Sequence, residues 1–244
     1  MLPKIDAPIY ELKLLSSGKK LKFRPFTVKE EKLFLMAAEA DDFKSVIDTT
    51  KQVINNCVLD DLDIEELPIF DIENIFLQLR AKSIGEVVNL RYRCNNKVTD
   101  EETKEEKNCN TVVEIDVNIN ELIPIFEKKE INKIEITEKM GVVLKYPNFK
   151  LLEKYNGENT SDSIIETIIC CIDYVYDAEN VYYSKDVSKE ELIEFVESMQ
   201  TKDLEKFKEF FDSAPKIQKN VSFKCPKCKY EEDVLVEGLE SFFV

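Results

Sequence analysis

Alternating apolar and polar positions predict a β-hairpin close to the start of the chain. Tyr10, Leu12 and Leu14 alternate with polar residues, and the alternation returns at Leu21 and Phe23 after a Ser-Ser-Gly turn. A period of two places every second side chain on the same face of a strand. We therefore expect two short antiparallel strands, each with one apolar face.

Apolar positions at steps of three and four residues predict that much of the remaining chain is helical. Two helices begin with a capping box, Thr27 with Glu30 and Ser188 with Glu191. A third begins at Asp71, and its acidic first turn and basic last turn suit the helix dipole. The predicted helices cover about residues 27–38, 43–57, 71–82, 149–155, 164–172, 188–199 and 201–211.

Alternation also predicts three further pairs of strands. They cover about residues 88–94 with 113–117, 134–136 with 142–144, and 221–225 with 234–236. The first and the last of these pairs carry cysteines where a strand meets a loop.

The turn at 225–228, with the sequence Cys-Pro-Lys-Cys, predicts half of a metal site. Two thiolates two residues apart can bind one tetrahedral zinc ion, but two more ligands must come from elsewhere. The chain has no histidine. Among the other cysteines, Cys94 and Cys109 lie in matching strand–loop–strand surroundings. We therefore predict a structural zinc site formed by Cys94, Cys109, Cys225 and Cys228, with independently packed thiols as the alternative.

The spacing of the first pair fits a zinc site if residues 97–108 are an insertion. Fourteen residues separate Cys94 from Cys109, whereas a zinc knuckle has two to four. Removing the insertion leaves Cys94-Asn95-Asn96-Cys109, a second pair with two intervening residues. Because the insertion is densely charged and loop closure costs little free energy, we expect a mobile surface loop.

The remaining cysteines have the pattern of buried core residues. Cys57 lies on the apolar stripe of its predicted helix. Cys170 and Cys171 are adjacent on a helix, so their side chains point about 100° apart and cannot form a knuckle together. We expect all three to fill the core.

Together these elements predict one α+β domain over residues 1–244, without internal repeats or flexible linkers. Its mainly helical body would carry the N-terminal β-hairpin. A discontinuous zinc-ribbon-like β module would be formed by residues 86–118 and 217–237. Closing the metal site would tie these distant segments together and couple folding to metal binding.

Composition disfavours most familiar enzyme classes. The 244 residues are 43% hydrophobic, lack a run long enough to cross a bilayer and begin without the features of a signal peptide. In the reducing cytoplasm that this implies, seven cysteines favour metal binding or packing over disulfides. Without histidine the usual general base is missing, and the five glycines are too scattered for a phosphate-binding loop.

Several stretches carry a resemblance to a known family. They are residues 3–15, 24–33 (RPFTVKEEKL), 70–83 (FDIENIFLQLRAKS) with 85–87, 141–147, and the end of the chain from Cys-Pro-Lys-Cys at 225–228 to Gly-Leu-Glu-Ser-Phe-Phe at 238–243. Together they resemble the baseplate hub subunit family of T-even-type contractile-tailed bacteriophages, and the insertion at 97–108 is where this sequence departs from it.

The resemblance implies a structural or assembly component of a phage tail baseplate hub, acting through protein–protein contacts and without catalysis. Its partners would be other baseplate hub or tail proteins. The absence of a long apolar run argues against a membrane partner, and the net charge of −15 disfavours nucleic acid. The expected location is the host cytoplasm during assembly, and the virion tail baseplate is left open as a second location.

Two other functions are the alternatives. A nucleic-acid-binding zinc ribbon is suggested by five lysines around the cysteine turn, Lys216, Lys219, Lys224, Lys227 and Lys229. Against it, the net charge of −15 repels phosphate backbones, and few aromatic residues interleave with these lysines to stack bases. A cell-wall hydrolase needs two carboxylates, but among 49 acidic residues no pair is singled out.

The last residues of the chain are candidates for binding a partner. Leu239, Phe242 and Phe243 fall at i, i+3 and i+4, which is one apolar face of a helical turn after Gly238. Buried aromatic anchors tend to dominate interface energies. We expect Phe242 to face the body of the protein and Phe243 to contact a neighbouring hub protein.

Overall fold

The computed structural model describes residues 5–40, 42–99, 104, 106–122, 132–154 and 161–238. The chain divides into two compact units. Unit 1 comprises Met1–Leu62, Ile72–Ile125 and Lys216–Val244, and unit 2 comprises Asp63–Asp71 and Phe126–Pro215. The mixture of helices and strands confirms the α+β class. The single domain over residues 1–244 stays a prediction.

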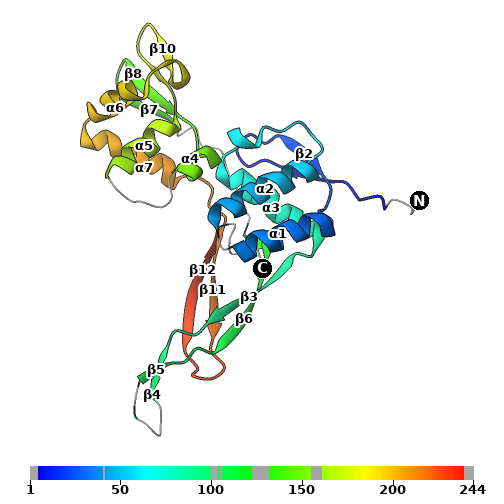
Figure 1. Cartoon of the computed structure of the whole chain (residues 1–244). Helices are drawn as coiled ribbons and strands as arrows, with labels where there is room; N and C mark the ends of the chain where they lie inside the picture. The colour runs from blue at the N-terminus through cyan, green and yellow to red at the C-terminus, as the bar shows by residue number, and fades with distance from the viewer. Residues whose placement is uncertain are drawn as a thin grey trace. The chain divides into compact units, whose positions relative to one another are not determined.

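Unit 1 begins with the predicted hairpin, in which β1 (Tyr10–Lys13) pairs antiparallel with β2 (Lys20–Phe23). Its helices, visible in Figure 1, are α1 (Val28–Ala40), α2 (Phe43–Cys57) and most of α3 (Ile69–Ser83). α3 begins two residues before the predicted cap Asp71. Asp71 is instead buried in the first turn, where its backbone N–H donates to the carbonyl of Pro68 at 3.0 Å.

The helices of unit 1 pack through aromatic rings and one buried carboxylate. Phe34 meets Phe26 and Phe76 edge to face, with ring centroids 5.6 and 5.4 Å apart. Glu30 is buried at the start of α1, where its carboxylate accepts the Thr27 backbone N–H at 2.8 Å and pairs with Arg24 at 3.0 Å. The predicted contact between Thr27 and Glu30 is therefore confirmed.

Two long hairpins complete unit 1. β3 (Val87–Arg93) pairs with β6 (Val112–Asn118), which a short η2 (Ile119–Glu121) follows, and β11 (Gln218–Lys224) pairs with β12 (Glu231–Glu237). β11 contacts β6, so segments about one hundred residues apart in sequence lie side by side (Figure 1). A third, small hairpin of β4 (Lys97–Thr99) and β5 (Glu106–Asn108) extends from the first.

Unit 2 is a four-stranded antiparallel sheet packed against helices. The strands, in the spatial order β10-β9-β8-β7, are β10 (Val181–Tyr183), β9 (Ile172–Tyr176), β8 (Met140–Leu144) and β7 (Lys133–Thr137). The short η1 (Ile64–Glu66) and η3 (Ser184–Asp186) and the helices α4 (Phe149–Lys154), α5 (Ser161–Cys171), α6 (Lys189–Glu197) and α7 (Thr201–Asp212) complete the unit. The capping box of Ser188 and Glu191 at α6 is confirmed.

β9 and β10 were not among the predicted elements. The sequence predicted a helix that ends at Ile172, but α5 ends at Cys171 and β9 begins at Ile172. Ile172 fits both the helical stripe before it and the alternation with Tyr174 and Tyr176 after it. Pairing of β9 with β8, which sets Tyr174 opposite Val143, makes the second pattern prevail. This sheet gives unit 2 a mixed composition, whereas the sequence suggested a mainly helical body.

Candidate metal centre

The four predicted cysteines come together at one end of the two long hairpins. The Sγ atoms of Cys94, Cys109, Cys225 and Cys228 all lie within 4.8 Å of one another. The first three side chains are buried, and that of Cys228 is half-buried. A tetrahedral zinc ion with bonds of about 2.3 Å would hold its sulfurs about 3.8 Å apart. The separations of 3.6 Å between Cys94 and Cys228 and 3.8 Å between Cys109 and Cys225 fit that requirement.

The second cysteine pair lies on a tight turn between β11 and β12. The backbone N–H of Cys225 donates to the carbonyl of Tyr230 at 2.8 Å, and that of Lys229 donates back to the carbonyl of Cys225 at 3.0 Å. Lys229 has a φ of 63°, in the left-handed region. These bonds close the chain into a knuckle whose amides face the first sulfur.

The first cysteine pair repeats this turn bond for bond. The N–H of Cys94 donates to the carbonyl of Thr111 at 2.9 Å, and that of Asn110 donates back to the carbonyl of Cys94 at 3.0 Å. Asn110 has a φ of 51° and occupies the position that Lys229 has in the other knuckle. Asn tolerates this conformation better than most residues do, because its side chain can hydrogen-bond locally.

The insertion extends outward from the first knuckle and does not disturb its hydrogen bonds. The N–H of Cys109 donates to the carbonyl of Asn96 at 2.8 Å, and the next pair outward, Lys97 opposite Asn108, starts the β4–β5 hairpin. The sequence predicted a mobile loop over residues 97–108. The structure instead continues the chain as a short hairpin with three cross-strand pairs. Residues 100–103 and 105, which belong to the same prediction, lie outside the described residues.

Apolar side chains between the two hairpins hold the knuckles face to face. The rings of Tyr92 on β3 and Phe223 on β11 stack with 6.4 Å between centroids and 16° between planes. The other buried residues of these strands alternate with exposed ones, as the sequence predicted; they are Val88, Leu90, Val113, Ile115, Val117 and Val236. This packing brings both sulfur pairs to a common point.

The thiols have unequal tendencies to ionise. The backbone N–H of Cys228, with that of Lys227, lowers the pKa of Cys225 to about 6 because these donors stabilise a thiolate. The hydroxyl of Thr111, 3.2 Å from the sulfur, lowers the pKa of Cys109. Burial raises the pKa of Cys94 to about 12. Four thiolates this close repel one another, so full ionisation requires a cation among them.

The side chain of Asn96 adds a donor that the sequence analysis missed. Its Nδ2 donates to Cys228 Sγ at 3.6 Å. Together with Thr111 it forms a second layer of donors around the sulfurs, which is typical of metal sites. The available signal was a polar residue two positions after each cysteine of the first pair, Asn96 after Cys94 and Thr111 after Cys109.

The donor set determines what this centre could do. Four sulfurs in tetrahedral reach suit Zn²⁺ or iron, and four protein ligands leave no open position for a substrate or an activated water molecule. Such an arrangement is suited to structural metal binding. Its residues fit the predicted zinc ion.

The three remaining cysteines lie away from this centre. Burial raises the pKa of Cys57 to about 11 and that of Cys171 to about 12, so both stay neutral. Cys170 is half-buried. None of them belongs to the four-sulfur cluster.

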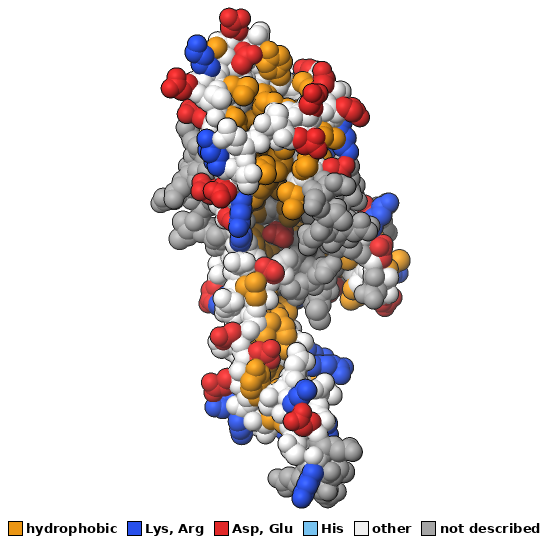
Figure 2. Space-filling view, turned by 90° about the vertical axis from the view of Figure 1, so that its left-hand side faces the viewer, with side chains coloured by type: hydrophobic (Ala, Val, Ile, Leu, Met, Phe, Trp, Pro, Cys, Tyr) orange, Lys and Arg blue, Asp and Glu red, His pale blue; other side chains and the backbone are white. Residues whose placement is uncertain are grey.

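Several lysines around the cysteine turn have partners within unit 1. Lys219 forms an ion pair with Glu121, Lys224 pairs with Glu231 at 2.7 Å, and the ammonium of Lys229 donates to the carbonyl of Pro226. On the face shown in Figure 2, basic side chains are interspersed with acidic ones and form no continuous stripe. This distribution does not favour nucleic-acid binding at that face.

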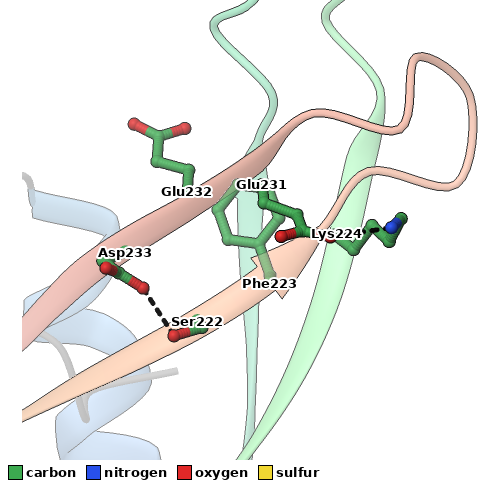
Figure 3. A pocket seen from close by; sticks show the side chains of 6 residues that line it. All are labelled: Ser222, Phe223, Lys224, Glu231, Glu232 and Asp233. Atoms are coloured by element: carbon green, nitrogen blue, oxygen red, sulfur yellow. Dashed lines mark hydrogen bonds and ion pairs between the residues drawn. The ribbon is translucent and has the colours of Figure 1, made fainter.

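A shallow pocket lies on the β11–β12 hairpin and is lined by Ser222, Phe223, Lys224, Glu231, Glu232 and Asp233 (Figure 3). Ser222 donates a hydrogen bond to Asp233, and Lys224 pairs with Glu231, so these carboxylates are engaged in contacts across the two strands.

The remaining predicted site residues, Phe242 and Phe243, lie outside the described residues. Among the helices that the structure describes, none combines the length and the apolar character needed to span a membrane.

Comparison with known proteins gives one match. A family model described as T4 bacteriophage base plate protein matches residues 7–244. Neither the curated proteins nor the solved structures give a significant match.

Proposed function

Because the chain belongs to the family of T4 bacteriophage base plate proteins, we propose that it is a structural or assembly component of the baseplate hub. It acts through contacts with other hub or tail proteins, and it carries a structural zinc ion bound by Cys94, Cys109, Cys225 and Cys228. The observation that carries the zinc proposal is the matched hydrogen bonding of the two knuckles around four converging sulfurs.

The proposed zinc ion supports the discontinuous zinc-ribbon module of residues 86–118 and 217–237. Each hairpin is two-stranded, and an isolated two-stranded hairpin is only marginally stable in water. The stacked rings of Tyr92 and Phe223 join the hairpins, and the metal would join them again at the end. Metal affinity then contributes directly to the stability of the module.

Two features support a non-enzymatic role. The chain has no histidine to act as a general base. The four-cysteine centre has no open ligand position at which zinc could activate water. Base plate proteins assemble with other tail proteins, which fits a chain that acts through its surfaces.

The zinc proposal is tested by elemental analysis of purified protein. Wild-type protein should contain one zinc per chain. Cys225→Ser and Cys228→Ser should lose the metal, whereas the matched control Cys57→Ser should keep it, because its thiol is buried elsewhere. Zinc that persists when both Cys94 and Cys109 are replaced would show that the first pair does not bind it.

The assembly role is tested in a phage that lacks this chain. Such a phage should accumulate incomplete baseplates in the host cytoplasm, and supplying the intact chain should restore tails visible by electron microscopy. Normal tails without the chain would contradict the proposal. Copurification of hub proteins with the tagged chain would identify its partners.

We further assign Phe243 as a partner contact and Phe242 as a side chain that faces the body of the protein. Phe243→Ala should impair copurification with hub proteins at a nearly unchanged melting temperature. Phe242→Ala should lower the melting temperature. A Phe243→Ala protein that melts early but still assembles would contradict this assignment.

A further inference from the structure

Both of the short sulfur contacts described above cross from one hairpin to the other. Cys94 precedes the insertion after β3, and its neighbour Cys228 lies in the β11–β12 turn. Cys109 precedes β6, and its neighbour Cys225 follows β11. The two contacts thus join the hairpins twice, between residues that are 134 and 116 positions apart in sequence.

We propose that the four cysteines are a redox modification site. When oxidised, they form two disulfides, Cys94–Cys228 and Cys109–Cys225, which replace the metal and keep the hairpins joined. The release of zinc in this step depends on the zinc site of the proposed function. The pairing of the thiols rests on their positions alone.

The oxidant is a hydroperoxide, for which hydrogen peroxide is the probe. One thiolate of a pair attacks a peroxide oxygen and becomes a sulfenic acid as the O–O bond breaks and hydroxide leaves. The other thiolate then attacks the sulfenic sulfur, and the S–S bond forms as hydroxide leaves. For the whole site, two hydrogen peroxide molecules and four protons convert the zinc tetrathiolate into two disulfides, one Zn²⁺ ion and four water molecules. Four electrons pass from sulfur to oxygen, and zinc keeps its charge.

The geometry favours pairs that cross between hairpins. A disulfide bond is about 2.05 Å long, so sulfurs that start 3.6 and 3.8 Å apart must each close by less than 2 Å. Side-chain rotation can supply much of this movement while the backbone hydrogen bonds of both knuckles stay in place. The half-buried side chain of Cys228 gives the oxidant a point of entry.

The consequence is a module that stays closed in two chemical environments. A thiolate metal site suits the reducing cytoplasm, and disulfides persist in oxidising surroundings. Disulfides inside each knuckle, such as Cys225–Cys228, would leave the two hairpins unlinked. Pairs that cross between them would preserve the link when a virion leaves the cell.

The test is a peroxide titration of the full-length protein carrying Cys170→Ser, which removes a half-buried thiol outside the centre. Zinc release is followed with a colorimetric chelator, and disulfides are mapped by mass spectrometry of a non-reduced digest. We expect two disulfides to form for each zinc released, in peptides that join residue 94 to 228 and 109 to 225. A thiol reductant should restore zinc binding.

Single variants test the pairing one bond at a time. Cys94→Ser should leave the 109–225 link, and the matched variant Cys109→Ser should leave the 94–228 link. If either variant fails to fold, substoichiometric peroxide on the parent protein should give the same two links. Disulfides within a knuckle, or sulfinic acids without disulfides, would overturn the proposal. If the purified protein contains no zinc and peroxide still forms both crossed disulfides, that result would contradict the zinc proposal and support the disulfide proposal.

Discussion

Excising residues 97–108 should leave the fold and the metal content of the protein intact. The hydrogen bond from Cys109 N to Asn96 O, 2.8 Å long, already brings the two ends of the segment together. After excision the first knuckle has two residues between its cysteines, as the second knuckle has. The hydrogen bonds that Cys94 makes with Asn110 and Thr111 lie outside the excised segment.

The expected change in stability is small and favourable. No side chain in β4 or β5 is fully buried, so excising these strands removes little apolar burial. Shortening the loop between the cysteines from fourteen residues to two lowers the closure cost by (3/2)RT ln 7, about 1.7 kcal/mol. Three exposed cross-strand pairs are lost, each worth a few tenths of a kcal/mol. The free energy of unfolding should therefore rise by about 0 to 2 kcal/mol.

The assay combines zinc content with denaturant unfolding, with and without a chelator. A matched variant moves residues 97–108 into the second knuckle, between Lys227 and Cys228, and should also bind one zinc because the two turns share the same hydrogen bonds. An excised protein that unfolds or loses its metal would refute the equivalence of the two knuckles.

Three further outcomes follow from packing and charge. Phe223→Ala should lower the free energy of unfolding by about 3 kcal/mol, measured by denaturant titration, because its buried ring packs between the hairpins, whereas exposed Leu235→Ala should cost less than about 0.5 kcal/mol. Burial would raise the pKa of Glu30, but hydrogen bonds, chiefly from Arg24, outweigh burial and hold the pKa at about 2. The ionised Glu30 therefore stabilises the fold above pH 4.5, and this stabilisation is lost as the pH falls from 4.5 to 2. Glu30→Gln should flatten that part of a profile of melting temperature against pH. Burial, with the nearby carboxylate of Glu237 on β12, raises the pKa of Glu73 to about 7. The contribution of Glu73 to stability is therefore fully present below pH 4.5 and is lost as the pH rises through 7. Glu73→Gln should raise the melting temperature more at pH 8 than at pH 5, and an equal change at the two pH values would contradict the pKa shift.

The cysteine cluster could be predicted because chemistry restricted the choices. Because the chain has no histidine, the cysteine pair at 225–228 needed two more cysteines to complete a metal site. Strand alternation placed Cys94 and Cys109 at strand ends comparable to those of that pair. Deleting the insertion gave the right spacing because the extra residues leave the knuckle as a paired hairpin. That pairing was missed, since its charged strands bury no apolar face to reveal a period.

Other features depended on contacts that a single sequence does not display. The hydrogen bond from Asn96 to Cys228 joins residues 132 positions apart, so no local sequence pattern predicts it. β9 was missed because Ile172 satisfies a helical and a strand period equally, and its pairing with distant β8 decides between them. Capping boxes were predicted well, since Ser188 and Glu191 need only their own turn of helix to form the contact.

Zinc X-ray absorption spectroscopy on the purified protein, combined with elemental analysis, tests whether the four cysteines bind one zinc ion. We predict one zinc per chain surrounded by four sulfur atoms at about 2.3 Å. Replacing Cys94 and Cys109 together should abolish that signal. Protein without zinc, or zinc with fewer than four sulfur ligands, would contradict the four-cysteine centre.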